Sequence, residues 1–164
     1  MGEFSVKNLE SSGGIAGALI AAMLFVAVPV ILYAAIRGGY SGLLTPNDAQ
    51  ALDSFFAYAL TLGTTITITA SLYCGYPKGT RSRLFFGTLS GVLIVAYAFM
   101  VLVMSGLTLI FTDRGIPLDT KYFALMVAYA SVPLIFSTVA EYVASRKRWL
   151  KSARSTRTQG MNAR

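Results

Sequence analysis

The chain of 164 residues is 55% hydrophobic and 13% charged, with a formal net charge of +7. This composition is too apolar for an ordinary soluble domain, and its long charge-free blocks are typical of integral membrane proteins. The one cysteine, Cys74, excludes an intrachain disulfide, and the absence of histidine excludes sites that require imidazole. The composition therefore indicates a membrane protein and excludes most classes of metalloenzyme.

Four apolar blocks follow one another, and each reaches or approaches the ~20 residues that cross a hydrocarbon core. Continuous apolar blocks predict helices, because membrane strands would alternate over about 10 residues. The sequence therefore predicts an all-α fold, a polytopic membrane protein with four transmembrane helices in an up-down bundle. The spans are expected at about 13–36, 54–76, 84–112 and 122–144.

Capping and turn residues support the boundaries of these spans. Thr45, Pro46 and Asp48 have the pattern of an N-cap, a proline at the first helical position and an acid in the first turn. Asp119 and Thr120 are expected to cap the fourth helix. All three connections are short, so no folded aqueous domain is expected between the spans.

Basic residues near the span ends give the expected orientation. Lys78, Arg81 and Arg83 lie in the second connection, and seven more basic residues follow Glu141. Because such segments stay in the cytoplasm, the basic tail (145–164) is predicted to be cytoplasmic, in a cell membrane. An even number of spans then places the N-terminus (1–12) on the same side. A cleaved signal peptide is the competing interpretation of the first block, although the block is longer than a usual signal-peptide core.

The second span is the most polar. Hydroxyl side chains on one helix suit a conduit for ions or small solutes, formed by the bundle or by an oligomer. The structural alternative is that threonine bonds to the carbonyl of the preceding turn and packs well at helix contacts. The candidate pore or polar-interior residues are Thr61, Thr64, Thr65 and Thr69.

Glycines at four-residue spacing mark the first and third spans. Gly13 with Gly17, and Gly87 with Gly91, are the predicted helix-packing residues, within one chain or between copies. The stretches GGIAGALIAAMLF and GTLSGVLIVAYAF also match in register. An internal duplication with two parallel repeats is therefore an alternative to chance similarity.

Charged residues are weak candidates for a site. The acids on the predicted outer side would attract cations or cap helices. Glu141 lies near the inner interface and is expected to pair with Arg146 or Arg148. Basic residues of the tail are predicted to contact anionic lipid headgroups. The outer acids are Asp48, Asp53, Asp113 and Asp119, and the lipid-contact residues are Arg146, Lys147, Arg148 and Lys151.

These features predict a protein that is not an enzyme and needs no cofactor or metal, since no convergent nucleophile, base or ligand set is found. The expected function is a non-catalytic scaffold or accessory subunit of a membrane complex, associating with itself or with another membrane protein. The alternative is an oligomeric ion or small-solute channel or transporter, whose route follows the threonine-rich second span. The tail carries no pattern for specific nucleic-acid binding.

Overall fold

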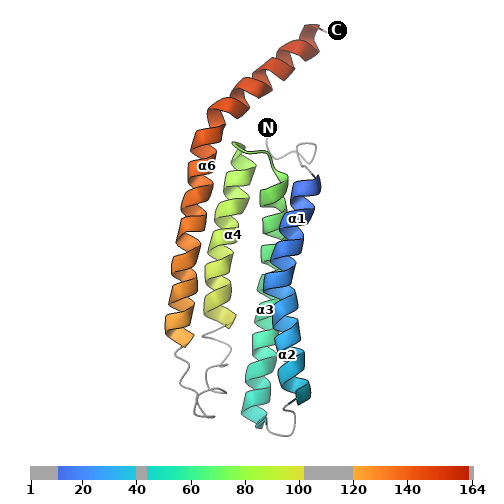
Figure 1. Cartoon of the computed structure of the whole chain (residues 1–164), viewed down its shortest axis with the longest axis vertical. Coiled ribbons are helices and arrows are strands. Elements are labelled where there is room, and N and C mark those ends of the chain that lie inside the picture. The colour runs from blue at the N-terminus through green and yellow to red at the C-terminus, as the bar shows by residue number, and fades with distance from the viewer. Residues whose placement is uncertain (1–10, 40–43, 102–119, 163–164) are drawn as a thin grey trace.

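The computed structural model describes residues 11–39, 44–101 and 120–162 (Figure 1). α1 (Ser11–Ala22), the π-helical segment η2 (Met23–Ala27) and α2 (Val28–Gly39) follow one another without a break. The remaining helices are α3 (Pro46–Gly75), α4 (Arg81–Phe99) and α6 (Thr120–Asn162). No strand occurs in the described ranges, so the all-α prediction is confirmed for them.

Three of these helices are long and apolar enough to cross a membrane: Ser12–Gly39, Pro46–Gly75 and Arg81–Phe99. They coincide with the first three predicted spans. The end of the third predicted span, residues 102–112, lies outside the described residues, as do Asp113 and Asp119. The fourth predicted span lies within α6, and its crossing stays a prediction.

The helices run in alternating directions and pack in a row, with α1 against α3, α3 against α4, and α4 against α6 (Figure 1). α1 and α6 are thus the two edges, and α3 lies inside the row. The start of α1, the turn between α3 and α4, and the C-terminal part of α6 lie at the same end (Figure 1). α6 continues as helix past residue 144, where the predicted span ends.

α3 begins with the cap that its sequence predicts. The Thr45 hydroxyl accepts from the Asp48 backbone N–H at 3.2 Å, and an Asp48 carboxylate oxygen accepts from the Thr45 N–H at 3.0 Å. Pro46 follows the cap, where its missing N–H costs nothing. Two backbone donors that a helix start leaves free are satisfied in this way, and Asp48 has a structural role.

The turn between α3 and α4 packs closely against α6. Thr80 caps α4 by accepting from the Arg83 N–H at 3.2 Å, and its hydroxyl donates to the Pro77 carbonyl at 2.9 Å. Gly79 has a φ of +85°, and a Cβ there would lie 2.7 Å from the carbonyl oxygen of Ser145. Only glycine combines this backbone conformation with so close an approach. The turn is therefore fixed to the helix beside it.

The continuous helix formed by α1, η2 and α2 is called the first rod. Pro29 accounts for its π-helical segment. Proline has no N–H, so the carbonyl of Phe25, four residues earlier, loses its α-helical donor. The helix widens at η2, where the Val28 N–H bonds to the Met23 carbonyl. The Tyr97 hydroxyl of α4 donates to the freed Phe25 oxygen at 3.4 Å. Because an unpaired carbonyl in hydrocarbon costs several kcal/mol, this contact stabilises the irregular turn.

Gly63 allows α3 to approach the same irregular turn. A Cβ at this position would overlap the carbonyl oxygen of Phe25. The buried apolar core follows toward the start of α3, where Leu52, Phe55 and Ala59 pack with Val101. The close contact at Gly63 therefore sets the distance between the first rod and α3.

The substitution Gly63→Ala is expected to lower the free energy of unfolding by about 1–3 kcal/mol, because the added methyl group overlaps the backbone of η2. Reversible unfolding in detergent micelles measures the change. Gly38→Ala is the matched control, since nothing lies within 4 Å of a Cβ there. Alanine favours a helix over glycine, so this control should be neutral or slightly stabilising. Equal losses in both variants would contradict the packing argument.

Candidate functional site

The threonines of α3 bond to their own helix. The hydroxyls of Thr61, Thr65 and Thr69 donate to carbonyls one turn earlier at 2.8, 2.8 and 3.1 Å, and Thr64 donates to the Leu60 carbonyl. Thr69 is buried, with 6% of its surface exposed. The other three are exposed on the outer surface of the chain. They do not line an interior channel of one chain.

The exposed threonines share one face of α3 with Ala57 and with Ile68, which is 61% exposed. At 100° per residue, Ala57, Thr61 and Thr64 lie on the side of the helix opposite Ile66. Ile66 is 1% exposed, whereas Ala57 is exposed. We call Ala57, Thr61, Thr64 and Thr65 the hydroxyl face. Each hydroxyl keeps acceptor capacity after its donation, so a neighbouring molecule can still bond to it.

Gly13 and Gly17 lie where α1 meets α3. A Cβ on Gly13 would lie 2.7 Å from the Cys74 carbonyl oxygen, and one on Gly17 would lie 2.7 Å from the Cys74 sulfur and 2.9 Å from the Ala70 carbonyl oxygen. The backbones therefore approach as closely as small residues permit.

Gly87 and Gly91 lie where α4 meets α6, as Gly13 and Gly17 lie where α1 meets α3. Their Cβ atoms would lie 2.5 Å from Thr138 Cγ2 and 2.5 Å from Ile135 Cγ1, respectively. Both glycine pairs thus face a helix of the same chain. The hydroxyl face of α3 is the small-residue surface that these contacts leave open.

Glu141 joins three elements at the end of the row that holds the α3–α4 turn. Its carboxylate accepts from the Tyr73 hydroxyl of α3 at 3.1 Å. It also pairs with Arg83 of α4 at 3.2 Å and with Lys78 of the turn at 3.7 Å. The pairing with Arg146 or Arg148 stays a prediction, and the sequence did not indicate Lys78 and Arg83, which reach Glu141 because the turn packs against α6.

Arg83 is the cation that this arrangement holds most firmly. Its side chain is 16% exposed, against 70% for Lys78. The guanidinium lies 4.5 Å from the centre of the Tyr73 ring and donates to the Tyr76 carbonyl at 2.9 Å. A mostly buried cation needs such partners, because removal from water is costly. Glu141 and Arg83 therefore lock α6 to α4 and α3.

The basic residues predicted to contact lipid differ in their surroundings. Arg146 donates to the Gly79 carbonyl at 3.1 Å and stacks on the Trp149 ring at 5.0 Å. Lys147, Arg148 and Lys151 are exposed on α6. Arg146 thus helps to hold the α3–α4 turn, whereas the other three face the surroundings.

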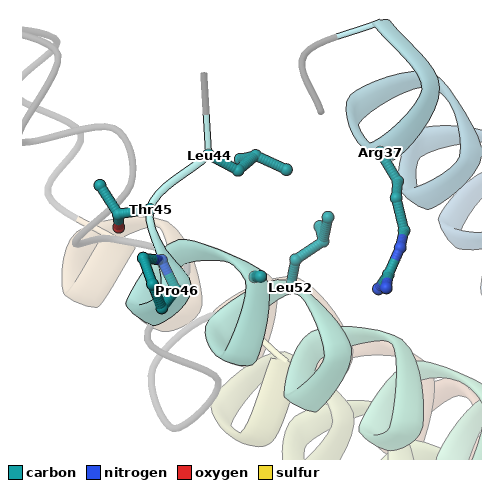
Figure 2. Close-up of a pocket in the computed structure, with 6 residues that line it drawn as sticks. Arg37, Leu44, Thr45, Pro46 and Leu52 are labelled. Carbon is teal, nitrogen blue, oxygen red and sulfur yellow. The ribbon is translucent and has the colours of Figure 1, made fainter. Parts of the chain in front are cut away.

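A second polar set ties α2 to α3 at the opposite end of the row. The Tyr33 hydroxyl donates to an Asp53 carboxylate oxygen at 2.8 Å, and Arg37 forms an ion pair with the same oxygen. Arg37 and Asp53 are 52% and 54% exposed, and their ion pair neutralises Asp53 within the chain. A hollow of about 290 Å³ lies beside Arg37, and Figure 2 shows Leu44 and Leu52 converging in it.

An apolar groove of about 380 Å³ lies between the edge helices of the row. Ile20 of α1, Ile66 of α3, Ile94 of α4 and Leu134 of α6 are among its walls, so all four packed helices contribute. The groove is on the side of α3 opposite the hydroxyl face. Ser90, 6% exposed, also lines it, and its hydroxyl has no hydrogen-bond partner within the described part of the chain.

The described residues bring no three His, Cys, Asp or Glu side chains close enough to hold a metal ion. No protein-family profile, curated protein or solved structure matches the chain. Fold and composition together define a helical protein with three helices compatible with membrane crossing.

A double-mutant cycle on Glu141→Ala and Arg83→Ala should give a coupling energy of about 1–3 kcal/mol in unfolding experiments, because either truncation leaves a half-buried charge without its partner. The matched control is the cycle on Arg37→Ala and Asp53→Ala. That pair is about half exposed, and a coupling of 0.2–1 kcal/mol, typical of surface pairs, is expected. Additive effects at Glu141 and Arg83 would refute the lock.

Proposed function

We propose that the chain crosses a cell membrane four times, with α6 as the fourth crossing and both ends in the cytoplasm. Two observations support this topology. The α3–α4 turn with Lys78 lies at the same end of the row as the basic C-terminal part of α6 (Figure 1). Lys/Arg-rich segments remain on the cytoplasmic side. A single orientation of the row therefore places both basic segments inside.

Impermeant maleimide labelling of intact cells tests this topology. In a Cys74→Ala background, cysteines at Asn47 and Lys121 should be labelled from outside, because they begin α3 and α6. Cysteines at Lys78 and Lys151 should be labelled only after the membrane is opened. Labelling of positions 121 and 151 from the same side would show that α6 does not cross.

We further propose that the protein is a non-catalytic scaffold or accessory subunit of a membrane complex, and that the hydroxyl face of α3 is its contact surface. The observation that carries the proposal is the contrast between exposed faces. Large apolar side chains that suit lipid are exposed on α1 (Leu19 at 62%), on η2 (Met23 at 66%) and on α6 (Phe136 at 70%). α3 instead exposes Ala57 and three threonines, with Ile68 at 61% as the one large apolar side chain among them.

Small residues favour helix association in membranes, because lipid tails are as apolar as leucine and close packing supplies the attraction. The glycine pairs of α1 and α4 are already used within the chain. The hydroxyl face can accept hydrogen bonds from a neighbouring helix, at a typical gain of about 0.6 kcal/mol each. It therefore fits a second copy or another membrane protein better than it fits lipid.

The second candidate function is an oligomeric channel or transporter. It is favoured by the exposure of Thr61, Thr64 and Thr65 on one face, where they would surround an axis in a symmetric oligomer. Ion or solute flux into proteoliposomes distinguishes the two functions. Flux that changes with Thr61→Val or Thr65→Val would replace the scaffold proposal with the channel.

The scaffold proposal predicts that the protein purified in mild detergent is larger than one chain, alone or with a partner. Thr61→Phe should release the single chain, because a bulky side chain prevents close helix approach. Light scattering after size exclusion gives the mass. Leu19→Phe is the control, since Leu19 is 62% exposed on α1 away from the proposed contact. A single-chain mass for the wild type, or no response to Thr61→Phe, would count against the proposal.

A further inference from the structure

The two ends of the apolar groove differ in chemistry. At one end lies Phe25, whose ring packs edge-to-face on Tyr97 with centroids 5.3 Å apart. At the other end lie Tyr73 and Thr138, and the Arg83 guanidinium stacks on the Tyr73 ring. The groove therefore runs from an aromatic floor toward the cationic turn between α3 and α4.

The shape and lining of the groove suit a hydrocarbon chain. Its wall on α1 and η2 extends from Gly17 to Phe25, about 12 Å at 1.5 Å per residue. Its lining is almost entirely apolar, with Ser90 and Thr138 as the buried polar exceptions. A hydrocarbon chain along the groove matches these walls.

Ser90 adds a polar requirement to this apolar groove. Its hydroxyl is buried, lines the groove and has no partner among the described residues. A buried hydroxyl without a partner costs about 1–3 kcal/mol, so an oxygen acceptor on the occupant would be favoured. Ser90 lies seven residues, about 10 Å, along α4 from Arg83. The occupant should thus carry oxygen atoms between its hydrocarbon and its charged end.

Basic residues lie beside the Tyr73 end of the groove and favour an anion. Arg83 stacks on Tyr73, and Lys78 and Arg83 share a single carboxylate partner, Glu141, so these three side chains carry a net positive charge. Lys78 is 70% exposed and contacts Glu141 only at 3.7 Å, so its ammonium group can also reach a ligand at the surface. A phosphate group at this position would be attracted to it.

We propose that the groove is a binding site for one anionic phospholipid, with an acyl chain between α1 and α6, a glycerol-linkage oxygen at Ser90 and the phosphate at Lys78. The site is independent of the proposed contact surface, which lies on the opposite side of α3. It also differs from general attraction of lipid to the basic part of α6, because it requires both the groove and the turn.

Native mass spectrometry with phosphatidylglycerol or phosphatidylcholine tests the site on the full-length protein. The wild type should retain one phosphatidylglycerol molecule in preference to phosphatidylcholine, and inorganic phosphate should not displace it. Lys78→Ala should weaken phosphatidylglycerol retention about fivefold, as expected for one basic residue near the surface. Lys147→Ala, which removes an exposed charge of α6 away from the groove, should leave the retention unchanged.

Two variants fill the groove. Ser90→Leu places a larger side chain inside it, with Thr88→Leu on another face of α4 as its control. Ile20→Trp fills it from the rim, and Ile20 is 63% exposed, so the fold should tolerate the change. Both should abolish retention of the lipid. Equal retention of the two lipids by the wild type, retention by folded Ile20→Trp, or a groove-dependent dimer without lipid would overturn the proposal.

Discussion

Polar groups inside a membrane must find their partners within the protein, and the packing of this chain depends on that constraint. It is most evident at Pro29, which leaves the Phe25 carbonyl without its helical donor. Tyr97 supplies a donor, and Gly63 makes room for the displaced backbone. The first rod, α3 and α4 thus meet at this irregular turn. The buried core around Leu52 lies next to it.

The need for partners within the protein also accounts for the positions of the charged side chains. The half-buried pair of Glu141 and Arg83 lies where α6 meets the α3–α4 turn, whereas Arg37 and Asp53 form a more exposed pair at the other end. The glycine pairs bring neighbouring helices together in the region between these ends. After these contacts are made, α3 retains two features: a hydroxyl face outward and an apolar groove on its other side. The proposed partner contact and the proposed lipid site follow from them.

Local patterns in the sequence were sufficient for the helices and the α3 cap, because apolar length and the Thr45–Asp48 spacing act over a few residues. Tertiary features needed the structure. Pro29 and Tyr97 are 68 positions apart in the sequence, so no local pattern links them. The sequence predicts tail cations as partners of Glu141, whereas its ion pair with Arg83 depends on the docking of Gly79 against α6, which no local pattern predicts. The threonines were recognised from composition, while their outward direction depends on how α1 and α4 flank α3.

The proposed contact between the hydroxyl face of α3 and another protein chain is tested most directly by spin labels in bilayers. Single labels at Ala57, Thr61 and Thr64, in a Cys74→Ala background, should collide rarely with both oxygen and a water-soluble nickel reagent. A label at Leu19, 62% exposed on α1, should collide often with oxygen, as expected for a side chain in lipid. Frequent oxygen collisions at the hydroxyl face would contradict the claim, and frequent nickel collisions would show a water-filled route in its place.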